Sequence, residues 1–290
     1  MGCCTSVEND WSLAGRAVKQ AFPDMESLRA EITIRGSFGI PFRAVYRGQP
    51  VFVKVTRVRD YTRRVLRKLT YLQDQPYVLV PIEYNILGER AVTIYPWLDG
   101  GDLVHKLTFS ISEQTKFRYI KGILRAVHYL HSKGLAHRDI KLENILTRDG
   151  DCVLIDVDTC DRASELYFSG TASYLPPRAT IDKCMTHEAL TRGDKLYWVD
   201  CYALGKTIAK ILLVGAVGGE ERRIWINWVD RERAAPSAVR GLLEQKKEQP
   251  WWDLVYWFCV ENVATLYETN PYLKLTDEAM AKYCSGTRDM

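Results

Sequence analysis

The chain lacks the features of several protein classes. Its eight cysteines are scattered, with no Cys-x-x-Cys pair and no histidine spacing that would build a zinc site. No apolar run reaches the roughly 18 residues that a membrane-spanning helix needs, and we recognise no cleavable secretory signal. The cysteines are therefore expected to be reduced thiols in a cytosolic protein, and membrane contact would have to come from attached lipids.

Neither sign of charge dominates the composition. The chain has 40 lysines and arginines against 36 aspartates and glutamates, which gives a net charge of +4. This excess is too small to indicate a nucleic-acid partner. With 290 residues and no internal repeat or low-complexity stretch, the chain is long enough for one large domain with a short leader.

The most informative pattern lies at residues 137–146, which read His-Arg-Asp-Ile-Lys-Leu-Glu-Asn-Ile-Leu. An oriented carboxylate such as Asp139 can accept the proton of a substrate hydroxyl, and the amide of Asn144 can reach a metal on nucleotide phosphates. Lys141 can neutralise charge on a group in transfer. The apolar residues between them would anchor the loop in a core, so the polar groups are held in place. The pattern indicates phosphoryl transfer.

Two further motifs flank this loop in the chain. Residues 51–55 alternate apolar side chains with Lys54, a pattern that predicts a buried strand with one functional lysine. Residues 153–158 form an apolar strand pattern that ends in acid at Asp156. Together with the loop, these motifs resemble the eukaryotic protein kinase family, from about residue 30 to about residue 283.

The resemblance implies an α+β, two-lobed fold with a small β-rich N-lobe and a larger helical C-lobe. The expected organisation is a leader at residues 1–29, the kinase domain at 30–283 and a tail at 284–290. The implied activity is transfer of the γ-phosphate of ATP to proteins, with ATP and Mg²⁺ as cofactors. Lys141 matches serine/threonine kinases better than tyrosine kinases.

The resemblance also assigns roles to individual side chains. Asp139 and Lys141 are the implied catalytic residues, and Lys54 would bind the α- and β-phosphates. Asp156 and Asn144 would bind the metal. The remaining nucleotide contacts are expected from two glycines of a phosphate-covering loop, the backbone of a hinge residue and a ribose-binding acid: Gly36, Gly39, Leu98 and Asp102.

The most serious departure from the family lies between residues 57 and 75. The family carries a glutamate there, on a helix, that pairs with the strand lysine, but this stretch contains no glutamate. Its apolar positions have helical spacing, and the missing glutamate's place falls near Val65 or Leu66. Lys54 must then be oriented by another group, and Asp156 is the nearest candidate by family geometry.

Other departures affect the activation segment. Val157 and Asp158 replace the phenylalanine and glycine that follow the metal-binding aspartate. Arg178 and Lys274 stand where the family has an ion pair, so this contact is expected to be repacked. Asp200 would hold the backbone near Arg138 by hydrogen bonds. A phosphate on the segment could satisfy Arg138, and the candidate positions are Thr159, Ser164, Ser169 and Thr171.

Two other segments leave several readings open. The predicted helix near residues 57–68 is rich in arginine, which fits a solvated face, docking to a phosphorylated activation segment or binding of anionic lipid. Residues 215–250, with Gly218-Gly219, many charges and Pro236, read as a variable connection.

The first residues, Met-Gly-Cys-Cys-Thr-Ser, fit N-myristoylation at Gly2 and palmitoylation at Cys3 and Cys4. One myristoyl chain binds membranes only marginally, so a second acyl group would make the anchoring stable. We expect a cytoplasmic, peripheral membrane protein. The amphipathic residues 7–29 are expected to pack on their own domain, with membrane binding as the alternative.

The leading hypothesis is a membrane-tethered serine/threonine protein kinase. The first alternative is a pseudokinase that scaffolds or allosterically controls other proteins, because the helix glutamate is missing. The second is a kinase-fold enzyme that acts on small molecules, which Lys141 and the activation-segment pattern disfavour. The substrate and the oligomeric state are not readable from the sequence.

Overall fold

The computed structural model describes residues 4–31, 39–59, 62–70, 72, 76–107, 111–157, 160–162, 171–177, 197–215, 218–231, 237–249 and 251–260. The chain forms two compact units. Unit 1 comprises Met1–Asp99 with Ile155–Asp158, and unit 2 comprises Gly100–Leu154 with Thr159–Met290.

Unit 1 is built on an antiparallel five-stranded sheet with the order β1-β2-β3-β5-β4. The strands are β1 (Glu26–Ala30), β2 (Ile40–Tyr46), β3 (Gln49–Arg57), β4 (Glu83–Leu87) and β5 (Arg90–Pro96). Successive side chains of a strand point to opposite faces. Val53 of β3, opposite Ile94, therefore lies on one face, and its neighbour Lys54, opposite Thr93, lies on the other.

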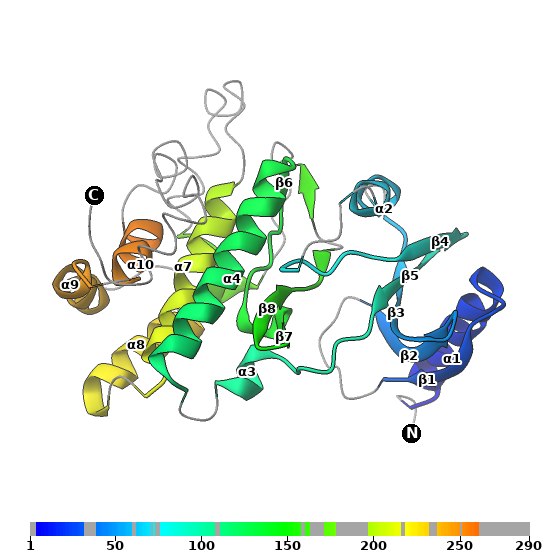
Figure 1. Ribbon diagram of the computed structural model, residues 1–290, viewed down its shortest axis with the longest axis horizontal. Helices are drawn as coiled ribbons and strands as arrows, with labels where there is room; N and C mark the ends of the chain where they lie inside the picture. The colour runs from blue at the N-terminus through cyan, green and yellow to red at the C-terminus, as the bar shows by residue number, and fades with distance from the viewer. Residues whose placement is uncertain are drawn as a thin grey trace. The chain divides into compact units, whose positions relative to one another are not determined.

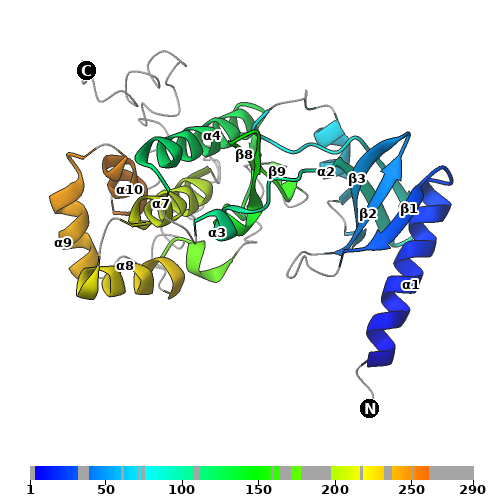
Figure 2. The ribbon, with the colours of Figure 1, turned by 60° about the horizontal axis from the view of Figure 1, so that its bottom comes forward.

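Helix α1 (Cys4–Ala21) packs on the face of this sheet that carries Val53. Figure 2 shows the helix beside this sheet, and its contacts include β3, β4 and β5. The Trp11 ring meets Phe42 of β2 edge to face, with ring centroids 5.5 Å apart. The shared core contains the buried α1 residues Ala14, Ala17, Val18 and Ala21. The expectation that the amphipathic leader packs on its own domain is confirmed.

Helix α2 (Thr62–Thr70) occupies the segment that lacks a glutamate. Val65, Leu66 and Leu69 are buried, as their helical spacing predicts. Arg63, Arg64 and Arg67 are exposed. The two positions nearest to the missing glutamate therefore hold core residues.

Unit 2 is mainly helical. Its described helices are α3 (Leu103–Lys106), α4 (Glu113–Ser132), α7 (Tyr197–Leu213), α8 (Gly219–Arg231), α9 (Ser237–Lys246) and α10 (Trp252–Cys259). Helices α4 and α7 lie side by side, and α10 packs on α7 (Figure 1). The unit also contains two pairs of short strands: β6 (Leu135–Ala136) with β9 (Asp161–Arg162), and β7 (Ile145–Arg148) with β8 (Asp151–Leu154).

The expected α+β class, with a β-rich N-lobe and a helical C-lobe, agrees with these two units. Within the described ranges, no helix is both long and apolar enough to span a membrane. Among the described residues, four cysteines are buried and form no disulfide: Cys152, Cys160, Cys201 and Cys259. Burial raises the pKa of the Cys259 thiol to about 12.

Candidate active site

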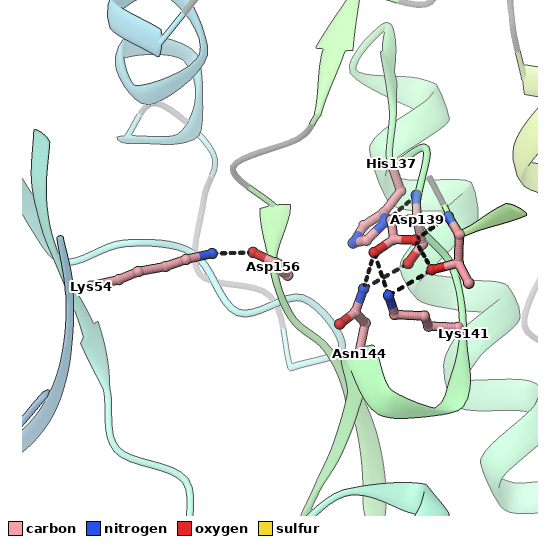
Figure 3. A network of polar contacts seen from close by, with 7 residues as sticks. Lys54, His137, Asp139, Lys141, Asn144 and Asp156 are labelled. Atoms are coloured by element: carbon pink, nitrogen blue, oxygen red, sulfur yellow. Dashed lines mark hydrogen bonds and ion pairs between the residues drawn. The ribbon is translucent and has the colours of Figure 1, made fainter. Parts of the chain in front are cut away.

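In unit 1, Lys54 of β3 forms an ion pair with Asp156, which follows β8 (Figure 3). Lys54 is 4% exposed and the Asp156 side chain is 12% exposed, so the pair is largely shielded from water. Asp156 has a φ of 63°, in the left-handed region that aspartate tolerates better than most residues. The partner expected for Lys54 in place of the helix glutamate is thus in contact with it.

In unit 2, Asp139 accepts hydrogen bonds from three side chains (Figure 3). Its Oδ2 lies 2.9 Å from Asn144 Nδ2 and 2.8 Å from Lys141 Nζ. Its Oδ1 accepts from both the backbone N–H and the hydroxyl of Thr171, each at 2.9 Å. Lys141 Nζ also donates to the Thr171 hydroxyl, at 2.7 Å. The carboxylate is therefore fixed in orientation by both of its oxygens.

This environment keeps Asp139 ionised. Burial raises the pKa of its carboxyl, but the hydrogen bond and charge of Lys141, the hydrogen bond from Thr171 and the charge of His137 outweigh burial and lower the pKa. A carboxylate with a lowered pKa is a weak base. It is therefore suited to orienting a hydroxyl by accepting its hydrogen bond, rather than to removing the proton before the reaction.

The loop around Asp139 is held by Asp200 near the start of α7. Asp200 is fully buried, and its two oxygens accept the N–H groups of His137 and Arg138, each at 2.7 Å. His131 of α4 contacts the same carboxylate at 2.9 Å. Arg138 has a φ of 72°, which costs a residue with a side chain roughly 1–2 kcal/mol. The predicted hydrogen bonds between this backbone and Asp200, which accepts them, are confirmed, and they hold the strained turn.

Gly39 and Asp102, which are predicted to contact the nucleotide, also stabilise the local backbone. Gly39 has a φ of 151°, and a Cβ there would lie 2.8 Å from Thr56 Cγ2 and 2.9 Å from the Val55 carbonyl oxygen. The backbone next to the functional lysine therefore requires glycine at this position. Asp102 caps α3, because its Oδ1 accepts the backbone N–H of His105 at 2.9 Å.

The remaining predicted residues are placed only in part. Leu98 follows β5 and is half-buried. Several residues of the predictions lie outside the described ranges: Gly2, Cys3, Gly36, Asp158, Thr159, Ser164, Ser169, Arg178 and Lys274.

Thr171 is the one activation-segment candidate that the structure describes. Sequence reasoning named it only as a phosphorylation candidate, whereas the structure places its hydroxyl between Asp139 and Lys141. A phosphate on this hydroxyl would bring a second anion against the Asp139 carboxylate. The signal available in the sequence was the Gly-Thr pair three residues before Tyr174.

Comparison with known proteins identifies the family. The protein kinase domain family matches residues 35–283. This chain belongs to the protein kinase domain family. The match covers both the strand with Lys54 and the loop with Asp139.

Individual relatives are distant. Serine/threonine-protein kinase mos of Patiria pectinifera is 26% identical over 252 residues, which cover 78% of this chain and 67% of the relative. Phosphorylase b kinase gamma catalytic chain, liver/testis isoform, of Rattus norvegicus is 24% identical over 81% of this chain and 57% of the relative. Serine/threonine-protein kinase H1 of Homo sapiens is 27% identical over 75% of this chain and 51% of the relative. The chain thus spans between about half and two thirds of the length of these relatives.

Proposed function

We propose that this protein kinase domain is catalytically active and transfers the γ-phosphate of ATP to serine or threonine hydroxyls of proteins. The observation that carries the proposal is the set around Asp139. The Asp139 carboxylate is ionised and oriented, and it contacts both the Lys141 ammonium and the Thr171 hydroxyl. The ammonium also donates to that hydroxyl. The relatives reported above are named as serine/threonine-protein kinases or as a phosphorylase kinase catalytic chain. These names support serine or threonine as the phosphate acceptor.

The chain's own residues would act as follows. Asp139 would accept the hydrogen bond of the substrate hydroxyl and direct its oxygen toward the phosphorus. Lys141 would offset negative charge that develops on the transferred group, because its ammonium already lies 2.8 Å from the Asp139 carboxylate. Thr171 fixes the positions of both groups. Since phosphoryl transfer depends on positioning and electrostatics, these contacts are the relevant ones.

The donor atoms in each unit fit ATP and a divalent ion. Asn144 donates through Nδ2 to the carbonyl and the carboxylate of Asp139, which leaves its amide oxygen as the ligand atom. Asp156 offers a carboxylate and Lys54 an ammonium. Oxygen ligands suit Mg²⁺, and an ammonium suits phosphate. When bound, the metal would offset the negative charge of the phosphates.

A pseudokinase remains the second candidate, and the Lys54–Asp156 pair is the observation that favours it. The ammonium and the carboxylate satisfy each other, and α2 presents apolar Val65 and Leu66 instead of a glutamate. If this pair is too stable to open, then neither side chain is available to phosphates or metal. The protein would then act by binding alone.

Label transfer separates the two candidates. Purified protein is incubated with γ-labelled ATP, Mg²⁺ and a generic protein substrate, beside Asp139→Asn and Lys54→Met. We expect label on serine or threonine with the wild type and a loss of at least about 100-fold with either variant. ATP binding without transfer by the wild type would establish the pseudokinase instead.

We also propose that the protein is tethered to the cytoplasmic face of a membrane by acyl groups on Gly2, Cys3 and Cys4. The sequence motif supports this proposal. Because α1 begins at Cys4, acyl groups would attach within a few residues of a helix that is packed on unit 1. Gly2→Ala should move the protein from membrane to soluble fractions of a eukaryotic cell. Unchanged partition of this variant would refute the tether.

A further inference from the structure

Helix α7 carries two fully buried side chains of opposite charge, Asp200 and Lys206. They lie six residues apart, or about 9 Å along the helix axis. Asp200 holds the backbone that leads into Asp139, as described above.

Lys206 holds the segment that contains Thr171. Its Nζ donates to the backbone carbonyl of Ser173 and, at 3.0 Å, to that of Trp228 in α8. The same ammonium lies 5.4 Å from the Trp228 ring centroid and 6.0 Å from that of Tyr174. Carbonyl oxygens and ring faces are the groups that compensate a cation for lost water. The ammonium thus joins α8, α7 and the segment at residues 171–174.

A rigid turn connects this contact to the catalytic residue. The short helix η3 (Ala172–Tyr174) follows Thr171, and the Tyr174 N–H donates to the Thr171 carbonyl at 2.8 Å. Ser173, which Lys206 holds, is therefore two residues from Thr171. Thr171 in turn donates twice to Asp139 and accepts from Lys141. A displacement of Ser173 would be passed directly to the hydrogen bonds of Asp139.

The sequence explains why another support is needed here. The activation segment ends in Arg178, and Lys274 occupies the place of its usual partner, so the family's ion pair cannot form from these two cations. Lys210, one helical turn after Lys206, adds a second layer, because it pairs with Asp230 at 2.7 Å and lies 5.0 Å from the Tyr174 ring centroid.

We infer that Lys206 is a positioning residue that sets Thr171, and through it Asp139 and Lys141, for phosphoryl transfer. Helix α7 then acts as a common support for both segments that meet at the catalytic carboxylate: Asp200 holds the loop before it, and Lys206 holds the segment that donates to it. The effect on turnover rests on the proposed kinase activity, whereas the effect on the segment does not.

The test compares Lys206→Met with Lys116→Met. Lys116 of α4 is also a buried lysine, and it contacts Glu113 and the Leu212 carbonyl, so it controls for the loss of a buried cation away from Asp139. Lys206→Gln, which keeps a donor without the charge, is the second variant if Lys206→Met does not fold. Circular dichroism melting establishes the fold of each variant.

Two readouts are measured for each folded variant. The first is hydrogen exchange at the Thr171 amide, which donates to Asp139; we expect at least about a 10-fold faster exchange in Lys206→Met and no change in Lys116→Met. The second is kcat for peptide phosphorylation; we expect a loss of about 10- to 100-fold in Lys206→Met with the KM for ATP unchanged, and partial recovery in Lys206→Gln.

Each outcome bears on the inference. Unchanged exchange at Thr171 in Lys206→Met would overturn it, as would an equal fall of kcat in Lys116→Met. If the wild type transfers no phosphate, then the proposed function fails, while faster exchange in Lys206→Met alone would still support Lys206 as the anchor of the segment.

Discussion

Lys54 forms an ion pair with Asp156, which lies 102 residues later in the chain. The two side chains are mostly shielded from water, so removing one takes away a nearby opposite charge from the other where water cannot replace it. Lys54→Met and Asp156→Asn should each lower the free energy of unfolding, and the double variant should lower it by less than their sum. We expect a coupling energy of about 1–3 kcal/mol from urea titrations. Additive effects would show that the pair does not contribute to stability.

The position of the missing glutamate gives a second prediction. Leu66 is buried in α2, and Lys54 already has a carboxylate partner. Introducing a charge by Leu66→Glu should therefore cost about 3 kcal/mol or more of folding free energy instead of restoring a family contact. Arg67→Glu, on the exposed side of the same helix, is the matched control and should stay within about 0.5 kcal/mol of wild type. Tighter ATP binding by Leu66→Glu would contradict this interpretation.

The packing of α1 predicts that the leader stabilises unit 1. Val18 is fully buried between the helix and the sheet, whereas Gln20 is exposed. Val18→Asp should lower the free energy of unfolding by about 3–5 kcal/mol, because it buries a charge without a partner. Gln20→Asp introduces the same charge in water and should have little effect. If the two variants melt at the same temperature, then α1 does not share the core of unit 1.

Acid should destabilise unit 2 partly through Asp200. Burial raises the pKa of this carboxyl, but hydrogen bonding and charge from His131, the charge of His137 and the Arg138 N–H outweigh burial and lower it below its ordinary value of 3.8. The unfolded chain therefore binds the proton more tightly, so this contribution is complete above the ordinary pKa and is lost as pH falls through the folded pKa.

Asp200→Asn should accordingly be less stable at neutral pH, and its free energy of unfolding should fall less steeply than that of the wild type as pH drops below the ordinary carboxyl pKa. Urea titrations at several pH values measure both effects. If the free energy of unfolding of Asp200→Asn falls with pH as steeply as that of the wild type, then Asp200 does not contribute to the acid sensitivity.

The sequence predicted most of what depends on local pattern. The strand around Lys54, the loop around Asp139 and the helix at α2 follow from motif order and periodicity. The hydrogen bonds that Asp200 accepts were implied by the family resemblance. The pairing of Lys54 with Asp156 was also expected, because residues 57–75 contain no glutamate and the family resemblance makes Asp156 the nearest other candidate.

Contacts between distant segments were harder to predict. The stretch at residues 215–250 was interpreted as a connection, but it forms α8 and α9. Its many charges hid Trp225 and Trp228, which are fully buried on one side of α8. The role of Lys206 was missed for a related reason: a lysine in an apolar helix shows that a partner exists, but not which carbonyl it binds.

The most direct test of the account is a crystal structure of the protein with a non-hydrolysable ATP analogue and Mg²⁺. We predict that Lys54 leaves Asp156 to bind the α- and β-phosphates, that the metal binds Asp156 and Asn144, and that Asp139 keeps its contacts with Lys141 and Thr171. A structure in which the analogue binds without metal while Lys54 stays paired with Asp156 would contradict phosphoryl transfer by this protein.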